Sequence, residues 1–200
     1  REPHIMPGCW RAPQQTAVVF DAQGFYCSGD ALKLADPRDP QLGLMFDGRI
    51  AEDFKLSSGV FVSVGPLRNR AVLEGSPYVQ DLVIAAPDRE CLGALVFPRL
   101  YECRRLAGLG AQASDAQVLD SEPVRQWFGD WLQRLNREAT GNASRLEWIA
   151  LLDEPASIDR GEITDKGSIN QRAVLQWRAA RVEALYRGED STILRAGPRP

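Results

Sequence analysis

The segment after Ser121 limits the fold most strongly, because its pattern is that of a helix with one apolar face. Ser121 is a favourable residue at the start of a helix, and Gly141 is a favourable residue just beyond its end. The apolar residues between them recur at helical spacing: Trp127, Phe128, Trp131, Leu132 and Leu135. A helix with such a face must be covered by a sheet or by other helices.

Short apolar runs on both sides of this helix predict the layer that covers it. Strands are expected at residues 78–85, 94–97 and 146–152. A small hairpin is expected at residues 54–64, and two more helices at 66–75 and 170–186. The fold class is therefore predicted to be α+β: a hairpin and a roughly three-stranded sheet, flanked by three or four helices.

The two ends of the chain have a different character. Residues 1–48 combine short apolar runs at 25–27, 31–34 and 42–47 with turns, which predicts a β-rich segment. Residues 188–200 are polar and rich in Arg and Pro, which predicts a disordered tail. The expected organisation is a β-rich segment at 1–48, a main α+β domain at 49–187, and a disordered tail at 188–200.

Composition excludes several classes of function. A net charge of −3 argues against a nucleic-acid protein that works by neutralising phosphates. The chain has one histidine and four cysteines without a Cys-x-x-Cys pair, so no metal site is expected. Reduced thiols, no apolar run of about 20 residues and no signal peptide predict a cytoplasmic protein without a transmembrane segment.

Three polar residues stand where a phosphate-bearing ligand could bind. Asp30 follows a glycine turn, and its carboxylate could accept two hydrogen bonds from the vicinal diol of a ribose. Arg49 follows Gly48 and offers a fork of donors, while Lys166 lies in a polar loop bounded by glycines just before a helix. Each of the three, taken alone, is more often an ordinary surface residue.

Three motifs taken together are more specific than any of these residues. Phe25-Tyr26-Cys27-Ser28-Gly29-Asp30, then Gly48-Arg49 through Gly59, then Gly161-Glu162-Ile163-Thr164-Asp165-Lys166-Gly167 resemble motifs of adenylate-forming acyl-CoA synthetases, in the family's order. The resemblance implies that residues 1–48 end a large adenylation domain. It implies that residues 49–187 form the mobile small carboxyl-terminal domain, which rotates between two half-reactions.

The resemblance also assigns roles to residues. Asp30 and Arg49 would bind the nucleotide, and Lys166 would be the catalytic residue that contacts the carboxylate and the α-phosphate. Ser58 and Gly59 would line the pantetheine tunnel.

The hinge position departs from the family pattern. The family commonly has Asp or Lys two residues after the arginine. Ala51 stands there in this chain, followed by Glu52. These two residues are the hinge candidates, and no polar hinge role is assigned to either.

The parent enzyme implied by the resemblance is an AMP-forming acid–CoA ligase that uses ATP, CoA, Mg²⁺ and a carboxylic acid. Residues 43–56 and 161–172 look similar to feruloyl-CoA synthases, and residues 54–62 look closer to the aryl and long-chain branches. In the family, the phosphate-binding loop, the adenine pocket and the acyl pocket belong upstream of residue 1. The chain alone is therefore expected to be inactive.

Two alternatives remain at this point. An adenylation enzyme could pass its acyl group to a carrier protein or a reductase module instead of CoA. A non-catalytic interaction module could instead expose four tryptophans, Trp127, Trp131, Trp148 and Trp177, although their periodicity favours packing in a core. A homodimer is left open in either case.

Overall fold

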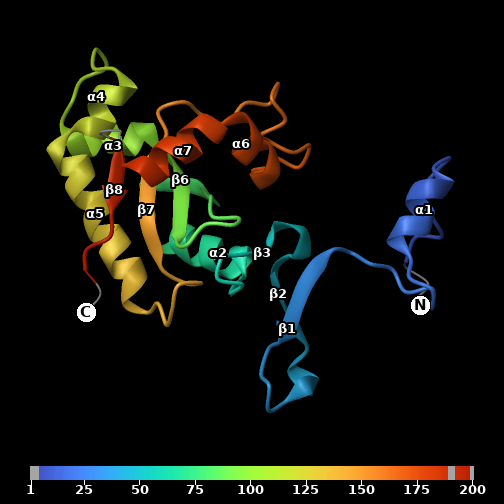
Figure 1. Cartoon of the computed structure of the whole chain (residues 1–200). Helices are drawn as coiled ribbons and strands as arrows, with labels where there is room; N and C mark the ends of the chain where they lie inside the picture. The colour runs from blue at the N-terminus through green and yellow to red at the C-terminus, as the bar shows by residue number, and fades with distance from the viewer. Residues whose placement is uncertain (1–4, 189–191, 199–200) are drawn as a thin grey trace. The chain divides into compact units, whose positions relative to one another are not determined.

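The computed structural model describes residues 5–188 and 192–198, which form two compact units (Figure 1). The units are Arg1–Ala51 and Glu52–Pro200. The division therefore falls three residues beyond the boundary predicted between residues 48 and 49.

The first unit contains one short helix and a two-stranded ribbon. Helix α1 spans Pro13–Val19, and strands β1 (Asp30–Leu34) and β2 (Leu44–Arg49) pair antiparallel around the 3₁₀ turn η1 (Pro40–Leu42). The predicted strand at 25–27 is wrong, since only Tyr26 forms an isolated bridge. The side chain of Asp21 accepts the main-chain N–H groups of Gln23 and Phe25, which turns the chain there instead of extending it.

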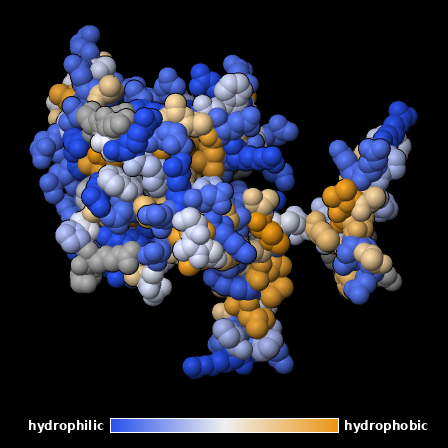
Figure 2. Space-filling model, in the orientation of Figure 1, coloured by the Kyte–Doolittle hydropathy of each residue, from blue (hydrophilic) through white to orange (hydrophobic). Residues whose placement is uncertain are grey.

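Large apolar side chains remain exposed on this ribbon. Figure 2 shows hydrophobic residues gathered over β1 and β2. The exposed residues there are Leu32, Leu34, Leu44, Met45 and Phe46. By their pairing, Leu32, Leu34, Leu44 and Phe46 share one face of the ribbon, and an apolar face of this kind is typical of one that another protein surface covers.

The second unit is built on a four-stranded sheet in the order β5–β6–β7–β8. Its strands are β5 (Val79–Ile84), β6 (Leu92–Pro98), β7 (Leu146–Leu151) and β8 (Ile193–Arg195). β6 and β7 run parallel, and the other neighbouring pairs are antiparallel. A separate hairpin joins β3 (Phe54–Lys55) to β4 (Phe61–Val62), after a 3₁₀ turn η2 (Ile50–Glu52) at the unit boundary.

Helices cover both faces of this sheet (Figure 1). One face carries α2 (Val64–Glu74), α3 (Leu100–Ala107), α4 (Asp115–Asp120) and α5 (Glu122–Arg137). The other carries α6 (Gln171–Trp177) and α7 (Ala179–Arg187). The predicted α+β class is thus confirmed. α3 and α4 were not predicted from the sequence.

The alternation of side chains along β5 divides the core into two clusters. Leu82 and Ile84 point to the α2–α5 side, whereas Val83 and Ala85 belong to the α6–α7 side. β6 is buried along its whole length, so its residues serve both clusters. This explains why its sequence is a continuous apolar run rather than an alternating one.

The helix predicted from the aromatic pattern is confirmed as α5. Phe128, Trp131, Leu132 and Leu135 are buried against the sheet. Trp127 packs beside Tyr78 with ring centroids 4.5 Å apart. The preference for core packing is wrong for one other tryptophan, since Trp177 is 60% exposed at the end of α6.

The prediction of a disordered tail is wrong for residues 192–198. Residues 193–195 pair with the open edge of β7, and Ala196 is buried. Within this otherwise polar stretch, Leu194 packs against one core cluster and Ile193 against the other, while main-chain hydrogen bonds supply the pairing. The predicted sheet of roughly three strands therefore has four, while residues 189–191 and 199–200 lie outside the described residues.

The prediction of one helix from 170 to 186 is also wrong. α6 ends before Arg178 and α7 begins after it, because Arg178 leaves helical geometry with φ −102° and ψ 26°.

No helix within the described ranges is long and apolar enough to cross a bilayer.

Candidate functional site

Asp30 and Arg49 lie directly opposite each other at the end of the β1–β2 ribbon. Oδ1 of Asp30 lies 3.1 Å from Nε of Arg49. This oxygen is buried and accepts no aligned hydrogen bond from any described residue, so it keeps acceptor capacity. Gly29 before it has φ +75°, a conformation that favours glycine. The arrangement offers a carboxylate oxygen and a guanidinium together, which suits a polar ligand with hydroxyl and phosphate groups.

Ser58 and Gly59 lie in the exposed turn of the β3–β4 hairpin. The N–H of Gly59 donates to the oxygen of Leu56 at 2.8 Å, and Gly59 has φ +81°. No atom lies within 4 Å of where a Cβ on Gly59 would stand, so its surroundings are open. The turn is held at its base because Ser57 N–H donates to the oxygen of Arg89 at 3.0 Å.

The predicted hinge residues belong to η2. Ala51 is exposed and is the last residue of the first unit, and Glu52 is the first residue of the second. Oε2 of Glu52 accepts a 3.2 Å hydrogen bond from Nε2 of Gln171, which opens α6. One hinge candidate therefore contacts the helix that follows the Lys166 loop.

Lys166 stands at the tip of a tight turn. Ile163 and Ile169 form an antiparallel bridge, and the N–H of Gly167 donates to the oxygen of Thr164 at 2.8 Å. The hydroxyls of Thr164 and Ser168 lie 2.8 Å apart and close the turn further. Lys166 is exposed and pairs with no group among the described residues, so its ammonium is free to meet an anion.

A buried ion pair that was not predicted from the sequence lies at the base of this turn. Glu162 is fully buried, and its carboxylate accepts bonds from Nε and Nη2 of Arg178 at 2.8 and 2.9 Å. The Arg178 hydrogen bonds hold the pKa of Glu162 below its ordinary value. Val174, Arg178 and Val182 follow one another at intervals of four residues, the spacing of one face of a helix. An arginine between two valines on that face was the sequence signal for a buried ion pair.

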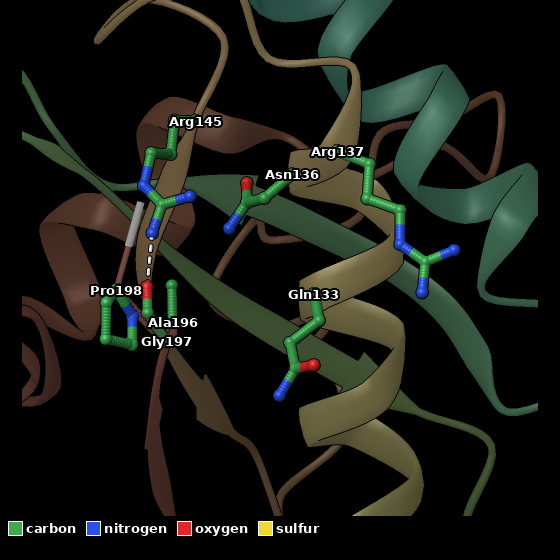
Figure 3. A pocket seen from close by; sticks show the side chains of 7 residues that line it. All are labelled: Gln133, Asn136, Arg137, Arg145, Ala196, Gly197 and Pro198. Carbon is green, nitrogen blue, oxygen red and sulfur yellow. Dashed lines mark hydrogen bonds between the residues drawn. The ribbon is translucent and has the colours of Figure 1, made fainter. Parts of the chain in front are cut away.

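A hollow of about 280 Å³ lies in another part of the second unit (Figure 3). It is lined by Gln133, Asn136, Arg137, Arg145, Ala196, Gly197 and Pro198. Its buried polar groups are already used: the Asn136 amide bonds both main-chain groups of Leu146, and Arg145 donates to the oxygen of Gly197. None of the predicted site residues lines it. Its contacts instead fix β7 and the segment after β8.

No group of three His, Cys, Asp or Glu side chains comes together as a metal-binding set within residues 5–188 and 192–198. The second unit contains the Lys166 turn and the Ser58–Gly59 turn, and the first unit contains the Asp30–Arg49 pair.

The family assignment follows from comparison with known proteins. Residues 56–190 match the family described as AMP-binding enzyme C-terminal domain. The chain belongs to this family. Its α+β fold is the fold of the carboxyl-terminal region of adenylate-forming enzymes.

Relatives of this chain are longer enzymes. Carboxylic acid reductase of Segniliparus rugosus is 30% identical over 184 residues, which are 91% of this chain and 14% of that protein. A long-chain-fatty-acid–[acyl-carrier-protein] ligase of Arabidopsis thaliana is 24% identical over 193 residues, 93% of this chain and 24% of that protein. The chain therefore spans less than a third of the length of either relative.

A solved structure shares the fold. The A domain of the Segniliparus rugosus carboxylic acid reductase, in complex with AMP and a co-purified carboxylic acid, superposes with a TM-score of 0.70 and 27% identity. The match covers 95% of this chain and 28% of that structure. Both units of the chain therefore have counterparts in an adenylating enzyme.

Proposed function

We propose that the chain is the carboxyl-terminal part of a ligase that joins a carboxylic acid to a thiol through an acyl-adenylate. The match of residues 56–190 to the family carries the proposal, because it includes both the Ser58–Gly59 turn and the Lys166 turn. The exposed apolar face of the β1–β2 ribbon further supports residues 1–48 as the end of a larger adenylation domain.

The first half-reaction would use Asp30, Arg49 and Lys166. A carboxylate oxygen of the acid attacks the α-phosphorus of ATP, and the bond to the β-phosphate breaks to give acyl-AMP and pyrophosphate. Oδ1 of Asp30, which accepts no aligned hydrogen bond, suits a ribose hydroxyl, and Arg49 would then turn toward the nucleotide. Lys166 would offset repulsion between the two anions as they meet. Mg²⁺, expected with ATP, would neutralise phosphate charge, and no residue of this chain is assigned to hold it.

The second half-reaction would use the open turn at Ser58 and Gly59. The thiol attacks the acyl carbon, the bond to AMP breaks, and a thioester forms. Open space around Gly59 suits the passage of a narrow pantetheine chain. The boundary between the two units, between Ala51 and Glu52, supports a hinge rotation that exchanges the two turns at the active site.

Coenzyme A is the proposed acceptor of the acyl group. The likeness of residues 43–56 and 161–172 to feruloyl-CoA synthases supports it, together with an aryl or long-chain acid as substrate. A carrier-protein thiol is the other candidate, and the relatives support it more than CoA, because they include the reductase and the acyl-carrier-protein ligase. Supplying the full-length parent with adenylated acid and either CoA or a phosphopantetheinylated carrier protein separates the two candidates.

Lys166→Ala in the full-length parent tests the function. Acid-dependent pyrophosphate exchange should fall by roughly 10²-fold or more, because one preorganised charge at the reacting centre is lost. Thioester formation from supplied acyl-adenylate should remain close to wild type. Equal losses in both half-reactions would contradict the role proposed for Lys166, and no acid-dependent exchange in the wild-type parent would overturn the function. The 200-residue chain alone should form no acyl-AMP.

A further inference from the structure

The Lys166 turn rests on Glu162, whose carboxylate is fully buried. Glu162 precedes the turn, and its main-chain oxygen accepts the N–H of Asn170, which follows the turn, at 2.8 Å. Its Oε2 accepts the N–H of Ser157 at 2.7 Å, and its own N–H donates to the oxygen of Ser157 at 2.9 Å. One residue therefore fixes the segment before the turn and both ends of the turn itself.

Arg178 holds this carboxylate in place. Besides its two bonds to Glu162, it donates from Nη1 to the oxygen of Glu154 at 3.1 Å and from Nη2 to the oxygen of Pro155 at 2.8 Å. Its guanidinium carbon lies 5.1 Å from the ring centroid of Phe97, in β6. The guanidinium thus connects the sheet, the 154–162 segment and the base of the Lys166 turn.

The buried Glu162–Arg178 pair has two energetic costs that a purely structural role would not require. Arg178 interrupts what the apolar pattern would make one continuous helix, and a charged pair is removed from water. Replacing such a pair by apolar residues is often neutral or stabilising, so burial of the pair is weak evidence of a stabilising role. A planar fork that bonds a carboxylate at two points does fix an orientation well.

We propose that Glu162 and Arg178 are positioning residues for the adenylation step: they hold the turn so that the Lys166 ammonium meets the reacting carboxylate and phosphate. This rests on the proposed function. The turn itself is short and closed by Thr164 and Ser168, so it moves as a unit on its base. A tilt at the base therefore displaces the tip, where Lys166 stands. A misplacement of about 1 Å can reduce a rate by roughly 10²-fold.

The test uses Arg178→Lys in the full-length parent. Lysine keeps the charge opposite Glu162 but cannot bond the carboxylate at two points and both carbonyl oxygens as well. Pyrophosphate exchange should fall roughly 10- to 100-fold, whereas thioester formation from supplied acyl-adenylate should change less than about 2-fold. Tryptic cleavage after Lys166 in the native protein should become faster, because the base of the turn is loosened.

Arg145→Lys is the matched control. Arg145 is also an almost fully buried arginine, bonded to a carboxylate and to a main-chain oxygen, but it holds the segment after β8. The control should leave the ratio of the two half-reactions and the cleavage after Lys166 unchanged. If Arg178→Lys prevents folding, the double variant Glu162→Gln with Arg178→Gln replaces it, since it leaves no unpaired buried charge.

Lys166→Ala, measured in parallel, separates the two proposals. Selective loss of adenylation in both Lys166→Ala and Arg178→Lys supports the positioning role. Lys166→Ala can cause a selective loss of adenylation while Arg178→Lys either slows both half-reactions equally or slows neither of them. The positioning role is then overturned, and the proposed function stands. If Lys166→Ala is not selective, the role of Lys166 is overturned, and the positioning role with it.

Discussion

The hydroxyl of Tyr186 donates a 2.6 Å hydrogen bond to the main-chain oxygen of Ala85, across 101 residues of sequence. The same hydroxyl lies 3.0 Å from the oxygen of Cys91, so it bridges the end of β5 and the start of β6. Burial raises the pKa of Tyr186 well above its ordinary value, which keeps the hydroxyl protonated as a donor. α7 is thereby held close against β6, and Gly93 lies under it.

Gly93→Ala should destabilise the protein because the contact with α7 leaves no room for a methyl group. A Cβ at this position would lie 2.7 Å from Cδ2 of Leu185 and 3.1 Å from the Tyr186 oxygen. Overpacking of this kind costs about 1–3 kcal/mol, measurable by urea unfolding. Gly129→Ala in α5 is the control: nothing lies within 4 Å of its Cβ position, and it should stabilise by about 0.5–1 kcal/mol. Similar effects at both glycines would show that the contact with α7 is looser than described.

Asp30→Ala in the full-length parent should weaken ATP binding. Loss of a charged acceptor for the ribose costs about 1.5–3 kcal/mol, which corresponds to a rise of roughly 10-fold or more in the KM for ATP. The free energy of unfolding should change by less than about 1 kcal/mol, since the pair with Arg49 is partly exposed. Asp47→Ala removes the other acid within the two strands, which pairs with Lys33 at 2.7 Å, and should leave the KM unchanged. An equal rise in both variants would argue against a nucleotide contact by Asp30.

Ending the chain at Gly188 should lower stability, because β8 protects the edge of β7. The truncation removes the pairing of residues 193–195, the burial of Ala196 and the bond from Arg145 to Gly197. A loss of about 2 kcal/mol or more is expected, equivalent to roughly 4–8 °C in Tm. A chain ending at Pro198 should melt like the full chain. An unchanged Tm in the chain that ends at Gly188 would mean that β8 contributes nothing to stability.

Cys103 should resist thiol reagents in the native protein. It is fully buried in α3, and burial raises its pKa from 9.0 to about 12, whereas Cys27 is exposed. Cys27 should react at pH 8 without denaturant, and Cys103 only after unfolding. Because the folded pKa is the higher one, the stability linked to Cys103 is complete below pH 9 and is lost as the pH rises toward 12. In Cys103→Ala this part of the alkaline loss should disappear, and an unchanged pH profile would contradict it.

Features with a strong local pattern were predictable from the sequence. The aromatic stripe of α5 and the apolar runs of β5, β6 and β7 gave correct elements, because burial on one or both faces leaves a periodic signal. β8 left no such signal, since it has only two apolar residues, Ile193 and Leu194, and pairs with a strand distant in sequence. α3 was missed because Cys103 is its only fully buried residue.

The candidate functional site was predictable only in part, because some of its contacts leave no local pattern in the sequence. Motif likeness could single out Asp30, Arg49 and Lys166, and the structure pairs the first two across β1 and β2. The Glu162–Arg178 pair joins residues 16 apart in sequence, and the spacing of apolar residues runs through Arg178 as if one helix continued. The hydrogen bonds in the structure show that the Arg178 guanidinium turns to the Glu162 carboxylate instead of solvent.

The division of the core by the sheet has a consequence for motion. The α2–α5 side holds many large buried side chains, including Trp131 and Phe128, whereas the α6–α7 side is the smaller cluster. Opening of α6 and α7 therefore exposes less apolar surface than opening of the opposite side, and costs less free energy. Amide protons of the two helices should accordingly exchange with solvent well before those of α5. The α6–α7 side, which follows the Lys166 turn, can thus open locally while the sheet stays folded.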